Sequence, residues 1–202
     1  MRRVHGIYVL KIAGMLLLVL TAAACSSNAP TRFYALTPVA AAKPASVLDR
    51  KLTLGLETVV IPGYLDRPQI VTRETPERFV LGEFDQWAEP FQGLVTRTLA
   101  EDLYQRTNAK EVTILPQSRG TPLDRVVEVV VLRFDAEGGA VILKADWSIF
   151  DRNEKELAGG RFETQSPISS SGDYAMIVAA MSEALGKLAQ EIAQAAAAKA
   201  PR

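Results

Sequence analysis

Histidine and cysteine are almost missing from this sequence, because each occurs once in 202 residues. The histidine is His5, close to the start of the chain, and the cysteine is Cys25. Downstream of Cys25 there is therefore no imidazole and no thiol. This absence excludes Ser-His-Asp and Cys-His nucleophile pairs, histidine metal ligands and thiolate zinc sites from that part of the chain. Only carboxylates remain, and they suit weak calcium or magnesium binding at most.

An excess of charge of one sign is also missing. The sequence has 23 Lys and Arg residues and 23 Asp and Glu residues, so its formal net charge is zero. No basic run occurs along the chain, and no internal repeat or heptad pattern is evident. The electrostatic basis of nucleic-acid binding is therefore lacking, and we expect no nucleic-acid partner.

Residues 1–24 have the three parts of a secretory signal peptide. Arg2, Arg3 and Lys11 make a basic start without an acid, an apolar run covers residues 12–20, and alanines occupy residues 22–24. The apolar run is shorter than the roughly 20 residues that a membrane-spanning helix needs, although a transmembrane anchor stays open as an alternative. We predict that this segment is a signal peptide that is removed.

Cys25 directly follows the three alanines, and two interpretations of it are open. In an ordinary secreted product, the chain would begin with a lone unpaired thiol. In a bacterial lipobox, Cys25 would carry a diacylglycerol on its sulfur, although Ala22 stands where that pattern usually has leucine. We favour the lipobox, because a lone unpaired thiol is an odd residue to keep. Two or more acyl chains would also hold the domain stably at a bilayer. Cys25 is thus the predicted lipidation site and membrane anchor, and no other cofactor or metal is expected.

Cleavage before Cys25 would change both the length and the charge of the chain. It would leave 178 of the 202 residues, and it would remove three of the 23 basic residues and none of the acidic ones. The mature chain would then have a net charge of −3, and its length suits one domain that buries roughly 70% of its unfolded surface. We assign residues 25–50 to an acylated N-terminus and flexible tether, with a candidate short strand at 32–36, and residues 51–202 to the folded domain.

Hydrophobic periodicity predicts both strands and helices in this domain. Phe91, Val95, Leu99 and Leu103 recur four apart, which is typical of an amphipathic helix, and Asn108 is a plausible left-handed stop. Strict alternation over residues 141–149 indicates a strand with one buried face. The predicted helices cover residues 88–107 and 174–192. The predicted strands cover residues 52–61, 69–73, 78–81, 126–135, 141–149 and 156–164. Together they indicate an α/β domain with two long amphipathic helices.

Residues 64–69, with the sequence YLDRPQ, form a loop whose role has two open interpretations. An aromatic residue and an arginine near two prolines suit a preformed partner-contact loop made by Tyr64, Leu65, Asp66 and Arg67. The alternative is a structural turn in which Arg67 pairs with Asp66 or another acid nearby.

Other side chains near this loop have less specific interpretations. We expect Trp87 to be a core residue, because tryptophan is mostly buried where it can pack. Asp66, Glu83 and Asp85 could be considered a carboxylate cluster for acid chemistry. We interpret them as solvated loop charges, because nothing in the sequence shows that they converge.

Four stretches of the sequence together resemble a known family. They are the lipobox followed by RFYAL at 32–36, IPGYLDRPQIV at 61–71, WAEP at 87–90, and the helix AMSEAL to EIA over 180–193. In this order, and over nearly the whole mature chain, they resemble the ABC-type transport auxiliary lipoproteins, which are PqiC/YmbA-like and MCE-associated. The stretch YLDRPQIV is the most specific of them. The resemblance implies an α/β domain with a mixed β-sheet and two long helices packed on it.

The resemblance also implies a function. It is that of a non-enzymatic outer-membrane lipoprotein that faces the periplasm and supports envelope integrity as an accessory subunit of an MCE-type lipid transport system. The implied partners are an MCE-domain periplasmic protein and its inner-membrane permease, and a homo-oligomer is compatible with the sequence. Two alternatives stay open. One is a periplasmic lipoprotein of another envelope machine, for secretion or lipopolysaccharide export, and the other is a hydrolase that uses carboxylates or a Ser-Lys pair.

Overall fold

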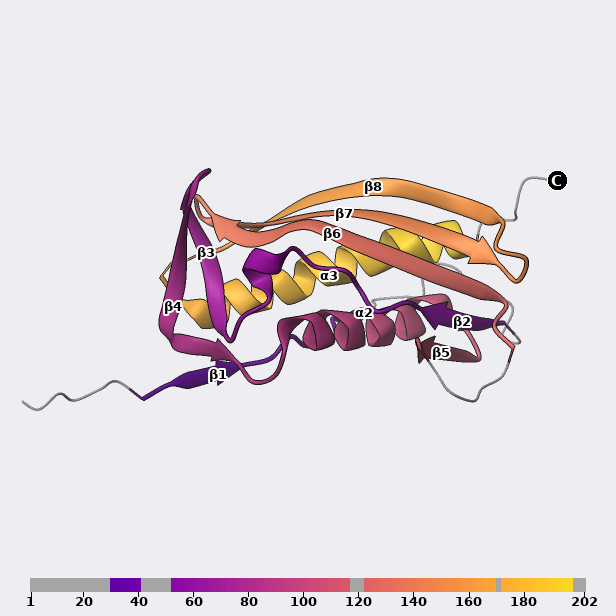
Figure 1. Cartoon of the computed structure of the whole chain (residues 1–202), viewed down its shortest axis with the longest axis horizontal. Coiled ribbons are helices and arrows are strands. Elements are labelled where there is room, and N and C mark those ends of the chain that lie inside the picture. Colours follow the sequence, from indigo (N-terminus) through magenta and orange to yellow (C-terminus); the bar gives the residue numbers. More distant parts are fainter. Residues whose placement is uncertain (1–29, 41–51, 117–121, 170–171, 198–202) are drawn as a thin grey trace, which may run out of the picture. The chain divides into compact units, whose positions relative to one another are not determined.

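A mixed β-sheet with two helices packed on it accounts for most of the chain that the computed structural model describes, which is residues 30–40, 52–116, 122–169 and 172–197 (Figure 1). The predicted α/β fold class with a mixed sheet is thereby confirmed. The predicted signal peptide and Cys25 lie outside these residues.

Groups of strands are separated by helices along the chain. The strands are β1 (Arg32–Tyr34), β2 (Thr53–Leu56), β3 (Gln69–Thr75), β4 (Arg78–Trp87), β5 (Glu111–Ile114), β6 (Arg125–Glu137), β7 (Ala140–Asp151) and β8 (Glu156–Pro167). The helices are the short 3₁₀ helix η1 (Gly63–Leu65) and the two long helices α2 (Phe91–Thr107) and α3 (Tyr174–Ala197).

β6 is the strand around which the sheet is organised. Along one edge it pairs antiparallel with β7, which in turn pairs antiparallel with β8. Its other edge is divided, because β2 pairs with it in parallel near its beginning and β3 pairs with it in parallel near its end. β5 lies beyond β2, whereas β4 and then β1 lie beyond β3. β6 is thus an inner strand with both edges paired, as its sequence predicted, but only one of its faces is buried. Val127, Val129 and Val131 face the core, whereas Val130 and Leu132 on the other face are 41% and 42% exposed.

The hydrophobic core lies between the sheet and the two helices. In β7 the alternate residues Val141, Leu143, Ala145, Trp147 and Ile149 are all buried, as the alternation predicted. α3 packs against β7 and β8, and α2 packs against α3 and β5. The apolar stripe of α3 faces inwards at Ile177, Met181, Leu185, Leu188 and Ile192. Each such fully buried side chain contributes about 1.5–3 kcal/mol relative to an exposed one, so these layers account for much of the stability.

Two chain reversals follow directly from residue type. Gly138 and Gly139 connect β6 to β7 with φ values of 58° and 83°. Positive φ at both central residues is the requirement of a type I′ hairpin turn, which glycine meets without strain. Asn108 ends α2 in the left-handed conformation with φ 55°, as the sequence predicted.

Several element bounds differ from the predicted ones, each for a local reason. α2 begins at Phe91 rather than at residue 88, because the residue before a proline avoids helical geometry and Pro90 therefore caps the helix. β4 continues from the predicted 78–81 to Trp87. β5 was not predicted, since four residues with no buried face carry little periodic signal. Residues 57–60 follow β2 along β6, to which Glu57 and Val60 donate backbone hydrogen bonds of 3.0 and 3.1 Å.

The short β1 belongs to the sheet rather than to a free tether. It pairs in parallel with the end of β4, so that Arg32 lies opposite Asp85 and Tyr34 opposite Trp87. The compact unit formed by the rest of the chain accordingly begins at Thr31. The Arg32 guanidinium donates to both Asp85 carboxylate oxygens at 2.8 and 2.9 Å, and the Tyr34 hydroxyl donates at 2.8 Å. The prediction that Asp85 is a solvated loop charge was wrong, because these donors allow its carboxylate to be buried.

Candidate partner-contact site

The predicted contact loop is held in a fixed conformation by backbone hydrogen bonds. Leu65 N–H donates to the Pro62 carbonyl at 3.0 Å, which closes the turn of η1. Asp66 follows with φ −79° and ψ 70°, and Arg67 N–H donates across it to the Leu65 carbonyl at 2.9 Å. These values are those of an inverse γ-turn, which is common where loops meet strands. The loop is therefore preformed, as the two prolines that flank it suggested.

The four predicted contact residues divide into two pairs with opposite orientations. Leu65 is buried in the core and Tyr64 is half-buried, whereas Asp66 and Arg67 are exposed. Within the described residues, neither Asp66 nor Arg67 makes a side-chain hydrogen bond or ion pair. The alternative in which Arg67 pairs with Asp66 is thus not what the structure shows. The residues that can meet a partner are Asp66 and Arg67, and Tyr64 and Leu65 hold them in place from behind.

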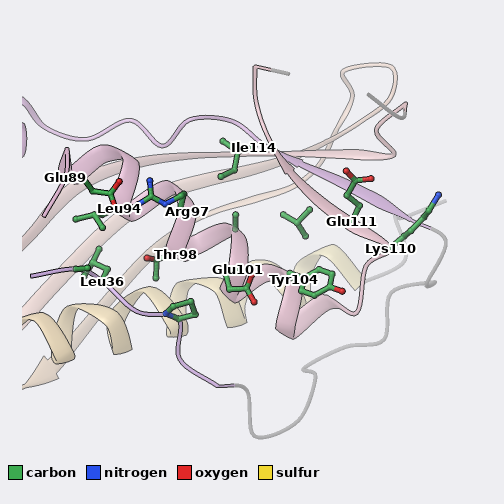
Figure 2. Close-up of a pocket in the computed structure, with 14 residues that line it drawn as sticks. Leu36, Glu89, Leu94, Arg97, Thr98, Glu101, Tyr104, Lys110, Glu111 and Ile114 are labelled. Carbon is green, nitrogen blue, oxygen red and sulfur yellow. Dashed lines mark hydrogen bonds and ion pairs between the residues drawn. The ribbon is translucent and has the colours of Figure 1, made fainter. Parts of the chain in front are cut away.

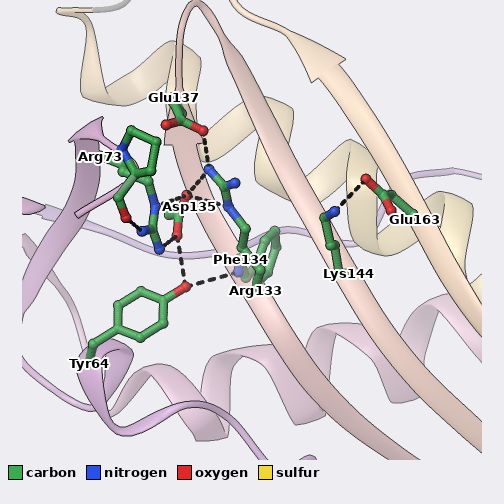
Figure 3. Close-up of polar contacts among 9 residues, drawn as sticks. Tyr64, Arg73, Arg133, Phe134, Asp135, Glu137, Lys144 and Glu163 are labelled. Carbon is green, nitrogen blue, oxygen red and sulfur yellow. Dashed lines mark hydrogen bonds and ion pairs between the residues drawn. The ribbon is translucent and has the colours of Figure 1, made fainter. Parts of the chain in front are cut away.

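Tyr64 is held by a polar cluster centred on the buried Asp135 of β6 (Figure 3). Its hydroxyl donates to Asp135 Oδ2 at 2.8 Å and accepts the Phe134 N–H at 3.4 Å. Asp135 is fully buried, and it also accepts from Arg73 Nη2 at 3.0 Å and from Arg133 Nη2 at 2.8 Å. A buried carboxylate is stable only when it is paired and hydrogen-bonded, so these three donors make its burial possible.

The charges of this cluster shift the pKa of its members in directions that follow from the contacts. Burial, together with the hydrogen bond to Asp135, raises the pKa of Tyr64 to about 12. The hydrogen bond to Asp135 raises the pKa of Arg73. The tyrosine is therefore neutral and the arginine charged at all physiological pH values. This fixed state suits a structural support and not a proton-transfer site.

Aromatic packing attaches the loop to the β3–β4 hairpin as well. The rings of Tyr64 and Phe79 are stacked with their centroids 4.6 Å apart. The Arg73 guanidinium carbon lies 4.3 Å from the centroid of the Phe79 ring, which is within the range of a cation–π interaction. Sequence reasoning missed this cluster, because its residues come from η1, β3, β4 and β6 and no local pattern connects them.

A pocket of about 310 Å³ lies between the contact loop and the segment that leads into α2. Its lining residues are Asp66, Arg67, Pro68, Trp87, Glu89 and Pro90. The two sides are joined because Trp87 N–H donates to the Pro68 carbonyl at 2.7 Å. Trp87 is buried and stacks on Phe91 at 4.6 Å, which confirms it as a core residue. The stretches YLDRPQ and WAEP, about 20 residues apart in the sequence, thus meet at one pocket.

A larger open groove of about 730 Å³ lies along the outer side of α2 (Figure 2). Three segments line it, namely residues 35–38, α2 and the stretch from Lys110 to Ile114. Apolar side chains such as Leu36 and Leu94 meet charges of both signs, including Arg97 and Glu101. The sequence did not predict it, because three of its fourteen lining residues come from the unpredicted β5. Its mixed lining does not define one class of ligand.

Within the residues that the structure describes, no three His, Cys, Asp or Glu side chains come close enough to hold a metal ion. The buried carboxylates Asp85, Asp102 and Asp135 are each paired with an arginine. Among the same described residues, no helix is both long and apolar enough to cross a membrane.

Solved structures with the same fold have low sequence identity to this chain. Protein XCC0632 from Xanthomonas campestris, of the family DUF330, is 20% identical with a TM-score of 0.68, and the match covers 81% of this chain and 93% of that one. A crystal structure of an uncharacterized protein is 18% identical with the same TM-score, and the match covers 82% of this chain and 98% of that one. These likenesses show the fold alone. No curated protein sequence matches the chain.

The fold is thus that of an α/β domain like the one in the DUF330 protein. The sequence assigns the chain to a named family. Residues 34–193 match the family model of the ABC-type transport auxiliary lipoprotein component. The chain belongs to this family, which confirms the resemblance drawn from the four sequence stretches. It is accordingly a lipoprotein of the cell envelope that associates with an ABC-type transport system as an auxiliary component.

Proposed function

We propose that this protein is acylated on Cys25, faces the periplasm from the outer membrane, and acts without catalysis as the accessory subunit of an MCE-type lipid transport system that supports envelope integrity. The family supports the lipoprotein character, and Cys25 is the one cysteine of the sequence. Ser26 follows it, where many lipoproteins kept at the inner membrane have aspartate. The proposed partners are an MCE-domain periplasmic protein and its inner-membrane permease.

We propose further that Asp66 and Arg67 contact the MCE-domain protein. The observation that carries this proposal is that both charges are exposed and unpaired within the described chain, on a preformed turn beside a pocket of about 310 Å³. A preformed loop binds with a smaller loss of conformational entropy than a flexible one. Arginine is also a residue that often dominates interface energies. The pocket next to it offers space for a partner side chain.

The double substitution Asp66→Ala, Arg67→Ala tests this contact. We expect it to weaken binding to the purified MCE-domain protein by about tenfold or more, which corresponds to 1.4 kcal/mol. The thermal midpoint should stay near that of the wild type, because both side chains point into solvent. Binding can be measured by co-purification and by biolayer interferometry.

A matched control removes an acid and an arginine elsewhere. Asp146 and Arg161 form an exposed ion pair between β7 and β8, and the substitutions Asp146→Ala, Arg161→Ala should leave binding unchanged. Equal weakening by both double variants would point to a general charge effect. Unchanged binding by the Asp66, Arg67 variant would contradict the contact.

The anchor is tested by Cys25→Ala. The folded unit begins at Thr31, so loss of the acyl chains should release the protein from the outer-membrane fraction without changing its thermal midpoint. Mass spectrometry of the N-terminal peptide should show acyl chains on the wild type alone. Equal membrane retention of both proteins would refute anchoring through Cys25.

A further inference from the structure

The sheet begins very close to the proposed lipid anchor. Only residues 26–31 separate Cys25 from Arg32, whose bidentate ion pair with the buried Asp85 joins β1 to β4. Even a fully extended chain spans at most about 3.6 Å per residue, so Arg32 lies within about 25 Å of Cys25. Six residues of the sequence thus lie between Cys25 and the first strand. This short tether confines one particular end of the sheet to the neighbourhood of the bilayer.

The confined end carries a group of exposed apolar side chains. Phe79, Val80 and Leu81 follow one another in β4 and are 37%, 41% and 42% exposed, and Phe33 in β1 is 65% exposed. We call these four residues the apolar edge. Within the described chain, β1 covers the outer side of β4 only from Asp85 to Trp87, so the outer side of β4 is free at residues 79–81. Because side chains alternate along a strand, Phe79 and Leu81 lie on one face of this free edge and Val80 on the other, so apolar side chains flank the edge on both sides. Such an edge indicates a place that another apolar phase covers.

The apolar edge also lies within reach of the membrane. Leu81 precedes Asp85 by four residues in β4, which corresponds to at most about 13 Å along a strand. Arg32 is opposite Asp85, and Figure 1 shows β1 and the β3–β4 hairpin at the same end of the sheet. The side chains of Arg32 and Arg78 are 63% and 71% exposed, and cations beside an apolar patch suit a headgroup layer. Asp85 and Glu74 pair with them, so apolar burial would supply most of the interaction.

We infer that the apolar edge rests in the surface of the bilayer in which Cys25 is anchored, so that the domain is oriented and not merely tethered. This inference rests on the proposed acylation of Cys25. The short tether favours a lipid surface over a protein partner or a second copy, because it keeps lipid within reach of this edge. The proposed contact residues Asp66 and Arg67 then keep a constant direction relative to the membrane.

Single-cysteine labelling can locate the apolar edge relative to the lipid. Because Cys25 is the one cysteine and would be acylated, Val80→Cys introduces the one free thiol for a nitroxide label. Val130→Cys is a matched control, since Val130 is likewise a strand valine with 41% exposure, but lies in the middle of β6. The full-length lipidated proteins are reconstituted in vesicles of phosphatidylethanolamine and phosphatidylglycerol. Paramagnetic resonance then measures collision of each label with oxygen, which dissolves in lipid, and with an aqueous nickel chelate.

For a label about 5–10 Å inside the interface, we expect the Val80 position to collide with the nickel chelate at least about threefold less than the Val130 position, and more with oxygen. Leu81→Cys, on the opposite face of the same strand, should give the same result if the whole edge rests in the interface, and it guards against a local effect of one substitution. Equal accessibility at Val80 and Val130 would overturn the inference. Protection of the Val80 label only after the transport partner is added would also overturn it, because the partner would then cover the edge. Protection that appears only with dipolar broadening between the labels of two copies would overturn it in favour of self-association.

Acylation is checked on the same samples by mass spectrometry. Acylated protein with a water-exposed Val80 label would overturn the membrane contact and leave the proposed anchor intact. Protein without acyl chains would overturn both the membrane contact and the anchor, while the contact made by Asp66 and Arg67 would be unaffected. The membrane contact can therefore fail while the anchor stands, and the contact made by Asp66 and Arg67 is independent of both.

Discussion

Replacing Tyr64 by phenylalanine should destabilise the protein although only one oxygen atom is removed. The hydroxyl donates to Asp135 at 2.8 Å, and Asp135 is fully buried. Phenylalanine keeps the ring that stacks on Phe79 at 4.6 Å, so the substitution isolates the hydrogen bond from the packing. After the change, Arg73 and Arg133 are the remaining side-chain donors to the carboxylate among the described residues.

The expected magnitude follows from the charge of the acceptor. A hydrogen bond to a charged group contributes about 1.5–3 kcal/mol, and removing the donor leaves part of a buried carboxylate without a partner. We place the loss near the lower end, about 1.5–2 kcal/mol, because two arginines still neutralise Asp135. For a domain of this size such a loss lowers the thermal midpoint by about 3–8 °C.

Urea unfolding of the wild type and the Tyr64→Phe variant measures this difference, provided that the slopes of the two transitions agree. Tyr104→Phe is the matched control, since Tyr104 is about half exposed on α2. It should change the free energy of unfolding by less than about 0.5 kcal/mol. A Tyr64→Phe variant as stable as the Tyr104→Phe variant would refute the view that Asp135 supports the contact loop.

Three further results are expected. The pKa of Tyr64 in the folded state is raised to about 12 from its ordinary value of 10. The stability that the neutral Tyr64 contributes is therefore complete below pH 10 and is lost as the pH rises toward 12. Over that range the wild type should lose more stability than the Tyr64→Phe variant. Arg106→Met leaves the fully buried carboxylate of Asp102 without its cation and should cost about 3–5 kcal/mol at pH 8. Burial raises the pKa of Asp102 to about 6, so this loss should shrink at pH 5, where the carboxyl group is protonated, and pH-dependent urea titrations would detect it. Arg32→Gln removes the charged partner of the buried Asp85 and loosens β1, whereas Arg161→Gln breaks a bidentate pair with the exposed Asp146. Arg32→Gln should therefore lower the urea midpoint by more, and the reverse order would contradict the role of β1 in the sheet.

The fold class followed from the sequence because long elements repeat their pattern many times. β7 buries every second residue, and α3 buries one stripe over 24 residues, so each pattern is clear without knowledge of its neighbours. β5 and β1, with four and three residues, have no such pattern. They are strands because β2 and β4 offer free edges to them, which is tertiary information.

The candidate site was predictable only in its local part. A loop with an aromatic residue and an arginine between prolines could be recognised from residues 62–68, and the structure shows it as a preformed turn. Which side chains face outwards was not predictable, because Tyr64 is turned inwards by Asp135, which lies 71 residues later in the chain. The burial of Asp85 was missed for the same reason, since its partner Arg32 precedes it by 53 residues.

The divided edge of β6 has a mechanical consequence. Among the described residues, β3 forms a ladder pair with β6 at one position, Thr72 with Ala136. Beside it, the Arg73 guanidinium of β3 reaches the Asp135 carboxylate of β6 at 3.0 Å. A pull on the chain ahead of β1 enters the domain through the ion pair of Arg32 with Asp85 and is passed from β4 to β3. The chain after β1 is held separately, because Leu36 is buried and Val39 N–H donates to Asp102 Oδ1 at 3.0 Å. Within the sheet itself, the side chains around Asp135 act as the coupling between the β3–β4 hairpin and β6.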